Sequence, residues 1–264
     1  MPEPSVSERP TAPAPFAGTG AVGASGRSGV GVLFDLDDTL LDLRTAMRGA
    51  LGIAAARELD GLPAAQRDAF TEHFSLDPGG YYDRYVAGEL GFAEQRFLRL
   101  RAALTLVGRT PNVTAEDFST RFEAAVVSGW APFPDVAPVL DALDKWGVPY
   151  GVVTNNVAAY QRRKLDGIGL GHVEVLIGSD TAGAPKPDAR AYLAGATALG
   201  TVPGATLMVG DNPEADVAGA VAAGLPAVLV DRLGRYPTLA GVTALTGILP
   251  VVEAMLAGGA RDLA

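Results

Sequence analysis

An alternation of short apolar runs with helical patterns between residues 134 and 231 constrains the fold more than any other feature of the chain. The apolar runs, which predict strands, are 148–154, 173–177, 206–209 and 227–230. The helical patterns between them are 136–146, 157–168, 187–199 and 213–223. Strands that alternate with helices usually form a parallel sheet that helices cover on both faces. The sequence therefore predicts an α/β core.

A further apolar run, residues 30–35, ends abruptly in acidic residues. Asp35, Asp37 and Asp38 follow one another closely where this predicted strand stops. Carboxylates crowded beside a core are costly, because burial and like charges both disfavour ionisation. Such a cluster is expected where a cation or a reacting group binds, although an acidic surface turn would give the same pattern.

Other polar residues also follow predicted strands or precede predicted helices. In parallel sheets, ligands bind outside the carboxyl ends of the strands. The polar residues at such places are Thr154, Asn155, Lys186, Asp211 and Asp216. Each of these residues could instead have a purely structural role. The threonine or the asparagine could cap a helix, and the lysine could be a solvated loop residue. The two acids could stabilise a helix N-terminus. Their common placement at strand ends favours a single site.

The stretch that follows the first strand differs from the rest, because strand-like runs give way to helical patterns. The clearest helical segments are 45–59 and 92–107, and Asp-Pro-Gly-Gly at 77–80 marks a turn between them. We expect four or five helices here. The predicted organisation is a disordered tail (1–28), a Rossmann-like α/β core (29–44 and 131–264) with a last helix over 249–256, and an inserted α-helical cap (45–130).

Composition narrows the function classes that the chain can serve. The 264 residues are 48% hydrophobic, which suffices for a full core, and the formal net charge of -9 disfavours a nucleic-acid binder. Cysteine is absent and only two histidines occur, which leaves hard oxygen ligands, and hence Mg²⁺, as the natural metal option. No apolar run is long enough for a membrane span, and the first 28 residues lack a signal-peptide pattern, so a cytoplasmic protein is expected.

The ordered set of strand-end residues resembles the haloacid dehalogenase (HAD) superfamily of hydrolases, in its phosphatase branch. The first motif of that family, Asp-x-Asp-x-Thr, is matched by Asp35-Leu36-Asp37-Asp38-Thr39. The strand-ending threonine is matched by Thr154, the lysine before a helix by Lys186, and the acidic pair by Asp211 and Asp216. The resemblance covers residues 30 to about 231, and the helical insert resembles the C1 cap of the family.

This resemblance implies a chemistry for the first motif. Asp35 would attack phosphorus and form an aspartyl-phosphate, which splits one hard displacement into two easier ones. Asp37 would protonate the leaving oxygen and then deprotonate the attacking water. Mg²⁺ would be held by the Asp35 carboxylate, the Asp37 backbone carbonyl and Asp211.

The same resemblance implies roles for the later motifs. Thr154 and the Asn155 amide would donate to the phosphate oxygens, and Lys186 would add positive charge to the transferring group. Asp216 would orient Lys186 or a metal-bound water. The implied activity is Mg²⁺-dependent hydrolysis of a small phosphorylated metabolite, by a monomer or homodimer.

Four alternatives stay open at this stage. A metal-independent haloacid dehalogenase is disfavoured by the acids at positions 37, 211 and 216, and a phosphonatase is disfavoured because the insert between Thr45 and Ser128 contains no lysine. A phosphomutase would share the same motifs. A non-catalytic binding protein on this fold would be expected to lack Asp35 or Asp37.

Substrate choice should depend on the cap. Candidate substrate contacts, which could equally be packing residues, are Tyr81, Tyr82, Arg84, Tyr85 and Arg96, with Asp42 and Arg44 at the boundary between cap and core. Trp130 and Phe133 are expected to pack at the hinge. Asp188 is expected in the first turn of its helix, and Asp38 at a solvated turn position.

Overall fold

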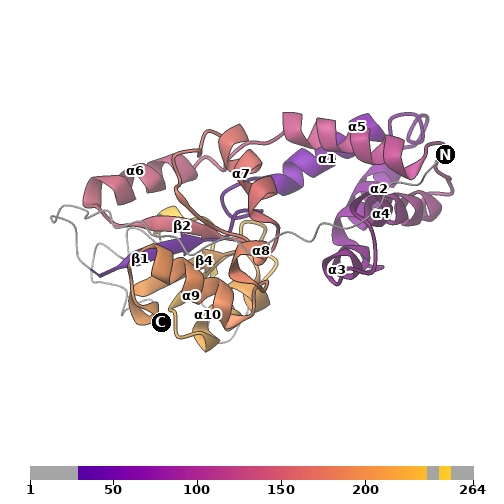
Figure 1. Ribbon diagram of the computed structural model, residues 1–264. Coiled ribbons are helices and arrows are strands. Elements are labelled where there is room, and N and C mark those ends of the chain that lie inside the picture. Colours follow the sequence, from indigo (N-terminus) through magenta and orange to yellow (C-terminus); the bar gives the residue numbers. More distant parts are fainter. Residues whose placement is uncertain (1–28, 237–243, 251–264) are drawn as a thin grey trace, which may run out of the picture.

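The core of the molecule is a parallel sheet of six strands. The computed structural model describes residues 29–236 and 244–250. The strands are β1 (Gly31–Phe34), β2 (Tyr150–Val153), β3 (Val175–Ile177), β4 (Thr206–Gly210), β5 (Ala227–Val230) and β6 (Ala244–Leu245). Their order is β3-β2-β1-β4-β5-β6, and every neighbouring pair is parallel (Figure 1). The sheet therefore reverses its direction of growth at β1, with β2 on one side and β4 on the other. The predicted α/β fold with a parallel sheet is confirmed.

Helices cover both faces of this sheet. They are α6 (Val136–Trp146) and α7 (Ala158–Gly167) on one face, and α9 (Ala189–Ala198) and α10 (Gly219–Ala222) on the other (Figure 1). The alternation of side chains along β1 explains this division, since Val32 and Phe34 pack with α6 and α7, whereas Leu33 packs with α9 and α10.

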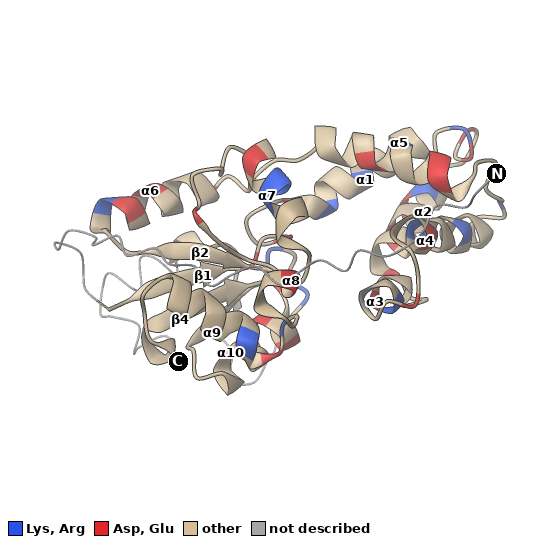
Figure 2. Ribbon diagram, in the orientation of Figure 1, with Lys and Arg blue, Asp and Glu red and all other residues tan. Residues whose placement is uncertain are grey.

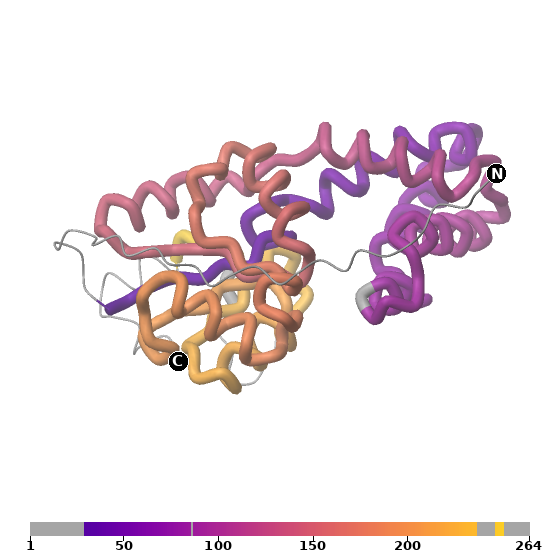
Figure 3. The backbone as a smooth tube through the Cα atoms, in the orientation of Figure 1, coloured from indigo at the N-terminus to yellow at the C-terminus, as the bar shows by residue number. Residues whose placement is uncertain are grey.

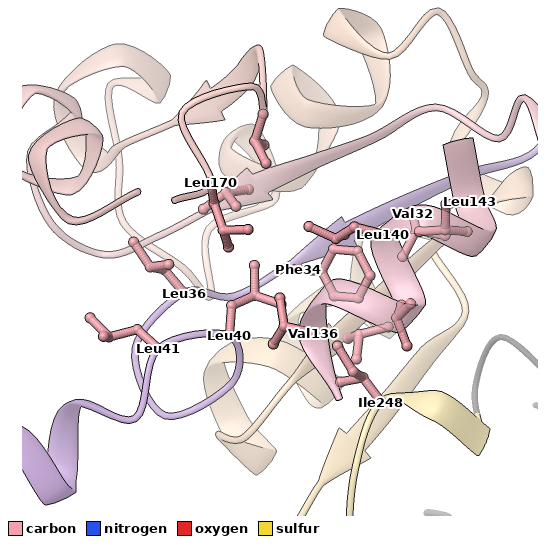
Figure 4. Close-up of a cluster of buried hydrophobic side chains, with 14 of the residues drawn as sticks. Val32, Phe34, Leu36, Leu40, Leu41, Val136, Leu140, Leu143, Leu170 and Ile248 are labelled. Atoms are coloured by element: carbon pink, nitrogen blue, oxygen red, sulfur yellow. The ribbon is translucent and has the colours of Figure 1, made fainter. Parts of the chain in front are cut away.

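The cluster on the α6 and α7 face is the larger of these two. Figure 4 shows Phe34 of β1 beside Val136 and Leu140 of α6, with Leu40 of the loop after β1 close by. All four residues of β1 are buried. The three central strands carry no charged residue, as their uniform tan colour in Figure 2 shows. Strands that are buried on both faces are expected to be apolar throughout.

A block of helices interrupts the core after β1. It consists of α1 (Leu43–Ala54), α2 (Ala64–Leu76), α3 (Tyr81–Val86), α4 (Phe92–Leu106) and α5 (Ala115–Ser128). The chain leaves the core along α1 and returns along α5, so that these two helices lie side by side (Figure 3). The block has its own apolar cluster, centred on Phe70, Phe74, Phe118 and Phe122. Trp130 packs against this cluster and against the core, as expected for the junction, and Phe133 packs against the core.

Several element boundaries differ from the predicted ones. The helix predicted over 45–59 is α1, which begins earlier because the Asp42 carboxylate accepts a hydrogen bond from the Thr45 N–H at 3.0 Å. The helix predicted over 187–199 begins at Ala189, and Asp188 is its N-cap rather than a first-turn residue. The short elements α8 (Ser179–Ala182) and β6 were not predicted, since four and two residues are too few for a periodic pattern.

The helix predicted over 213–223 is divided. Residues Pro213–Ala218 form a π-helical segment, and α10 follows it. The Asn212 side chain accepts hydrogen bonds from the backbone N–H groups of Glu214 and Ala215, and the Tyr192 hydroxyl donates to the Ala215 carbonyl. π-helical turns are often found at functional sites, and this one carries Asp216.

Two predictions concern residues outside the described ranges, the tail over 1–28 and most of the helix over 249–256. Leu249 and Pro250 have helical conformation. In the described ranges, no helix is both long and apolar enough to span a membrane.

Candidate active site

The predicted site residues meet at the carboxyl edge of the sheet, where the strand order reverses. Asp35 follows β1, Asp211 follows β4 and Thr154 follows β2. Since β1 pairs with both β2 and β4, the three strand ends are neighbours. This edge is where parallel sheets bind ligands.

Lys186 joins two of the acids. Its Nζ lies 2.7 Å from Asp35 Oδ1 and 2.6 Å from Asp216 Oδ1, and all three side chains are buried. Burial lowers the pKa of Lys186, but the two carboxylates more than offset it, so that the pKa is raised. Burial is also the largest reason that the pKa of Asp35 is raised well above its usual value, although Lys186 opposes that shift. The lysine is therefore a fixed cation beside Asp35.

Asp216 is held on both of its oxygens. Oδ1 contacts Lys186, and Oδ2 accepts a hydrogen bond from the Asn212 N–H at 2.9 Å. Gly210 makes room for this carboxylate, because a Cβ at that position would lie 2.3 Å from the Asp216 Cγ. Of its two predicted roles, the contact with Lys186 is the one present in the structure.

The carboxylates also form a cluster suited to a divalent cation. Oxygen atoms of Asp35, Asp211 and Asp216 lie within 4.8 Å of one another. Burial, followed by the charges of Asp216 and Asp38, raises the pKa of Asp211 to about 7, although Arg235 lowers it by donating to Oδ2 at 2.9 Å. This concentration of buried negative charge fits a hard cation. Asp35 and Asp211 each have one carboxylate oxygen that accepts no hydrogen bond from the described residues. The backbone carbonyl oxygen of Asp37 accepts none from them either.

Two residues that the sequence analysis missed hold Asp37. Lys164 Nζ lies 2.7 Å from both Asp37 oxygens, and Gln161 Nε2 donates to Asp37 Oδ2 at 3.2 Å and to Thr154 Oγ1 at 2.6 Å. Both lie on α7 and are buried. Their spacing with Leu165 and Ile168 places these polar residues on the apolar face of the helix. Polar residues on an apolar face are expected to have buried partners, and this pattern could have identified them from the sequence.

Asn155 contacts the chain rather than the open site. Its Nδ2 donates to the Lys186 carbonyl at 2.9 Å, and its Oδ1 accepts from the Lys186 N–H at 2.6 Å. These two bonds fix the loop that carries the lysine. The Asn155 backbone N–H donates to no described residue, so the backbone rather than the side chain is free to meet an anion.

Asp38 has a structural role that the sequence did not reveal. It adopts a left-handed conformation with φ of 62°, and its Oδ1 accepts a hydrogen bond from the Arg44 N–H at 2.9 Å. Burial raises the pKa of Asp38 above its usual value. Asp38 lies in a turn and is partly exposed, as expected, but its side chain also anchors the start of α1.

A cavity of about 550 Å³ lies over these residues, between core and helical insert. The candidate cap contacts Tyr82 and Arg96 line it, as does the boundary residue Arg44. Tyr81, Arg84, Tyr85 and Asp42 are not among its lining residues, and Arg84 instead pairs with Glu89 at 3.1 Å. Further lining residues from the insert are Met47, Asp77, Gln95, Arg99 and Phe122.

Comparison with known proteins places the chain in a family. The family model of haloacid dehalogenase-like hydrolases matches residues 31–224. A phosphoglycolate phosphatase of Caulobacter vibrioides is 32% identical over 212 residues, which cover 77% of this chain and 79% of that protein. A glyceraldehyde 3-phosphate phosphatase of Methanothermobacter thermautotrophicus is 28% identical over 209 residues, which cover 76% and 84%.

Solved structures of the same fold include enzymes with another reaction. A defluorinating L-2-haloacid dehalogenase superposes with a TM-score of 0.67 at 25% identity, over 88% of this chain and 96% of that one. The agreement therefore extends over both the sheet and the helical insert. With the family match, the sequence relatives and the site geometry in accord, this chain belongs to the haloacid dehalogenase-like hydrolases, and the phosphatases named above are among its sequence relatives.

Proposed function

We propose that this phosphatase hydrolyses small-molecule phosphomonoesters with the help of Mg²⁺, and that Asp35 is its nucleophile. The observation that carries the proposal is the grouping of a buried lysine with Asp35 and Asp216, next to a third carboxylate, Asp211, at the strand edge. A fixed cation and a cluster of acids beside one nucleophile suit a reaction in which negative charge moves between oxygens.

The first half-reaction follows from the hydrogen bonds of Asp35. Lys186 binds Oδ1, so Oδ2 is the oxygen available to attack phosphorus. The new bond joins this oxygen to phosphorus as the bond to the leaving alkoxide breaks. Lys186 keeps its proton, because its pKa is raised, and it stabilises charge on the transferring group as a permanent cation. The Thr154 hydroxyl accepts from Gln161, which leaves its own proton free for a phosphate oxygen.

The two half-reactions together need one group that gives a proton in the first and takes a proton in the second. We assign it to Asp37, which follows Asp35 by two residues, lines the same cavity and is held by Lys164 and Gln161. It donates a proton to the leaving oxygen and then accepts one from the water that attacks the aspartyl-phosphate. Phosphate leaves and Asp35 is regenerated.

Magnesium would be held by the Asp35 carboxylate, by Asp211 and by the Asp37 backbone carbonyl. When bound, it screens the nucleophile from the negative charge of the substrate phosphate. We place the cap at residues 45–130 and the core at 29–44 and 131–264. The cavity between cap and core would admit small molecules. Whether the protein is a monomer or a homodimer stays a prediction.

The direct test is phosphate release from a panel of metabolites by the purified protein, beside halide release from 2-chloropropionate. The proposal expects phosphate from at least one phosphomonoester in the presence of Mg²⁺, and no halide. Halide release without phosphate release would overturn it in favour of a dehalogenase. Conversion of a substrate into a phosphorylated isomer, without phosphate release, would identify a mutase.

A further inference from the structure

The cap contributes a buried cation that has no carboxylate partner. Arg99 of α4 is 8% exposed and lines the cavity. Its Nε and Nη2 donate to the Phe74 carbonyl, at 3.0 and 2.7 Å, and its guanidinium lies 4.4 Å from the centre of the Phe74 ring. Within the described ranges no carboxylate oxygen lies within 4.0 Å of it. A buried charge without a counter-charge is costly, so an anion in the cavity would stabilise it.

The preceding turn of α4 adds two more unsatisfied polar groups. Arg96 Nη2 contacts Glu123 at 2.6 Å, but its Nη1 is buried and has no hydrogen-bond partner among the described residues. The side-chain oxygen of Gln95 is buried without a partner as well. Both residues line the cavity. Buried polar groups are nearly always hydrogen-bonded, so these groups are expected to meet a ligand.

The acidic residues at this end of the cavity do not form ion pairs with the two arginines. Asp77 and Asp83 line the cavity, but neither carboxylate lies within 4.0 Å of a basic nitrogen of Arg96 or Arg99. Burial lowers the pKa of Arg99, and the charge of Asp77 opposes that shift. Asp77 uses Oδ2 to accept a hydrogen bond from the Tyr82 N–H at 2.7 Å. Burial raises the pKa of Tyr82 to about 12, so this cavity-lining hydroxyl is protonated at neutral pH and adds a donor.

We propose that the substrate is a phosphomonoester with a second anionic group, either a carboxylate or another phosphate, and that Arg99 and Arg96 bind this second group. The phosphoryl group to be transferred lies at Asp35 and Lys186, at the core end of the same cavity. Gln95 accepts a hydrogen bond from a hydroxyl of the substrate. This inference rests on the proposed phosphatase function and names the substrate class for it.

The test compares related phosphomonoesters with and without the second anionic group, which are called charged and neutral below. One pair is 3-phosphoglycerate with glycerol 3-phosphate, and the other is fructose 1,6-bisphosphate with fructose 6-phosphate. We expect the charged member of at least one pair to have a kcat/KM about tenfold higher or more, since a charge-assisted hydrogen bond is worth at least that factor. The pair that shows the preference distinguishes a carboxylate from a phosphate.

Replacement of the arginine should remove the preference selectively. In Arg99→Met the KM for the charged substrate rises about tenfold, whereas KM for its neutral counterpart and kcat for both stay within about twofold. Arg99→Lys, which keeps a charge but not the planar fork, gives a smaller rise in the same KM and serves if Arg99→Met does not fold. Arg101→Met is the matched control, because Arg101 lies on the same helix but is exposed.

Two results would overturn the inference while leaving the phosphatase intact. One is equal kcat/KM for the charged and neutral members of both pairs in the wild type. The other is an equal loss on charged and neutral substrates in the Arg99 variants, which would show that Arg99 only binds the C-terminal end of α2.

Failure of the proposed function gives a different result, namely no phosphate from any substrate. The subsite is then tested by thermal melting. 3-Phosphoglycerate or fructose 1,6-bisphosphate should raise the melting temperature of the wild type more than the counterpart without the second anionic group does. That difference should vanish in Arg99→Met and become smaller in Arg99→Lys. An equal shift with charged and neutral ligands in the wild type would refute the subsite as well.

Discussion

At the residue scale, the position of the Asp37 carboxylate depends on a side chain from a helix more than a hundred residues further along the chain. Lys164 is 2% exposed, and both Asp37 oxygens lie 2.7 Å from its Nζ. The Asp37 side chain itself is 30% exposed, so water and substrate still reach it. The buried lysine thus holds the Asp37 carboxylate in place, while the exposed part of that carboxylate stays accessible for proton transfer.

Lys164→Met should therefore impair catalysis more than folding. The substitution keeps most of the side-chain volume but leaves Asp37 without its cation. Since general acid–base groups contribute roughly 10²–10⁴ to a rate, we expect kcat to fall about tenfold or more. Steady-state kinetics and thermal melting measure the two effects separately.

The control for that variant is Arg163→Met, because Arg163 is the exposed neighbour on the same helix. It should keep the wild-type kcat. Lys164→Arg should retain more activity than Lys164→Met, because it keeps a charge near Asp37. An unchanged kcat in Lys164→Met would contradict the role of Lys164 in positioning Asp37.

At the element scale, the close approach of α9 to the sheet depends on a glycine. A Cβ at Gly195 would lie 2.7 Å from the Leu33 Cδ1 and 2.9 Å from the Val153 Cγ2, and both of these residues are fully buried. Leu33 and Val153 belong to the two strands that Asp35 and Thr154 directly follow. Packing of α9 against the sheet is thereby linked to the geometry of the site.

Alanine at two helical glycines should have opposite effects on stability. Gly195→Ala overpacks the core and should lower the free energy of unfolding by about 1–3 kcal/mol. Gly52 is exposed on α1, and a Cβ at that position would have no atom within 4 Å. Gly52→Ala should therefore raise the free energy of unfolding by about 0.5–1 kcal/mol. Urea denaturation measures both, and a stable Gly195→Ala would contradict this packing of α9.

At the scale of the whole molecule, the sequence predicts the parallel sheet well, because alternation of strand and helix is a local pattern. It also predicts that Asp35, Thr154 and Asp211 meet, since the ends of parallel strands share one edge. It does not predict the contact of Lys164 with Asp37, because a lone lysine in a helix usually points to solvent. The sequence also does not predict that residues 213–223 divide into a π-helical segment and α10. Tyr192, which donates a hydrogen bond to that segment, lies on another helix.

Removal of the metal should stop the reaction without unfolding the protein. Asp35 and Asp211 would lose the cation that we propose for them, while Lys186 and Arg235 would still pair with them. We expect EDTA to abolish phosphate release and added Mg²⁺ to restore it, with the circular dichroism spectrum unchanged. Full turnover in EDTA would instead favour a metal-independent reaction.

The central claim, that Asp35 is the nucleophile of a phosphatase, is tested most directly by Asp35→Asn. This variant keeps the size and most hydrogen-bonding capacity of the side chain, and Asp216 still pairs with Lys186. The account predicts that phosphate release with Mg²⁺ falls below detection while thermal melting shows a folded protein. Phosphate release at the wild-type rate by folded Asp35→Asn would contradict it.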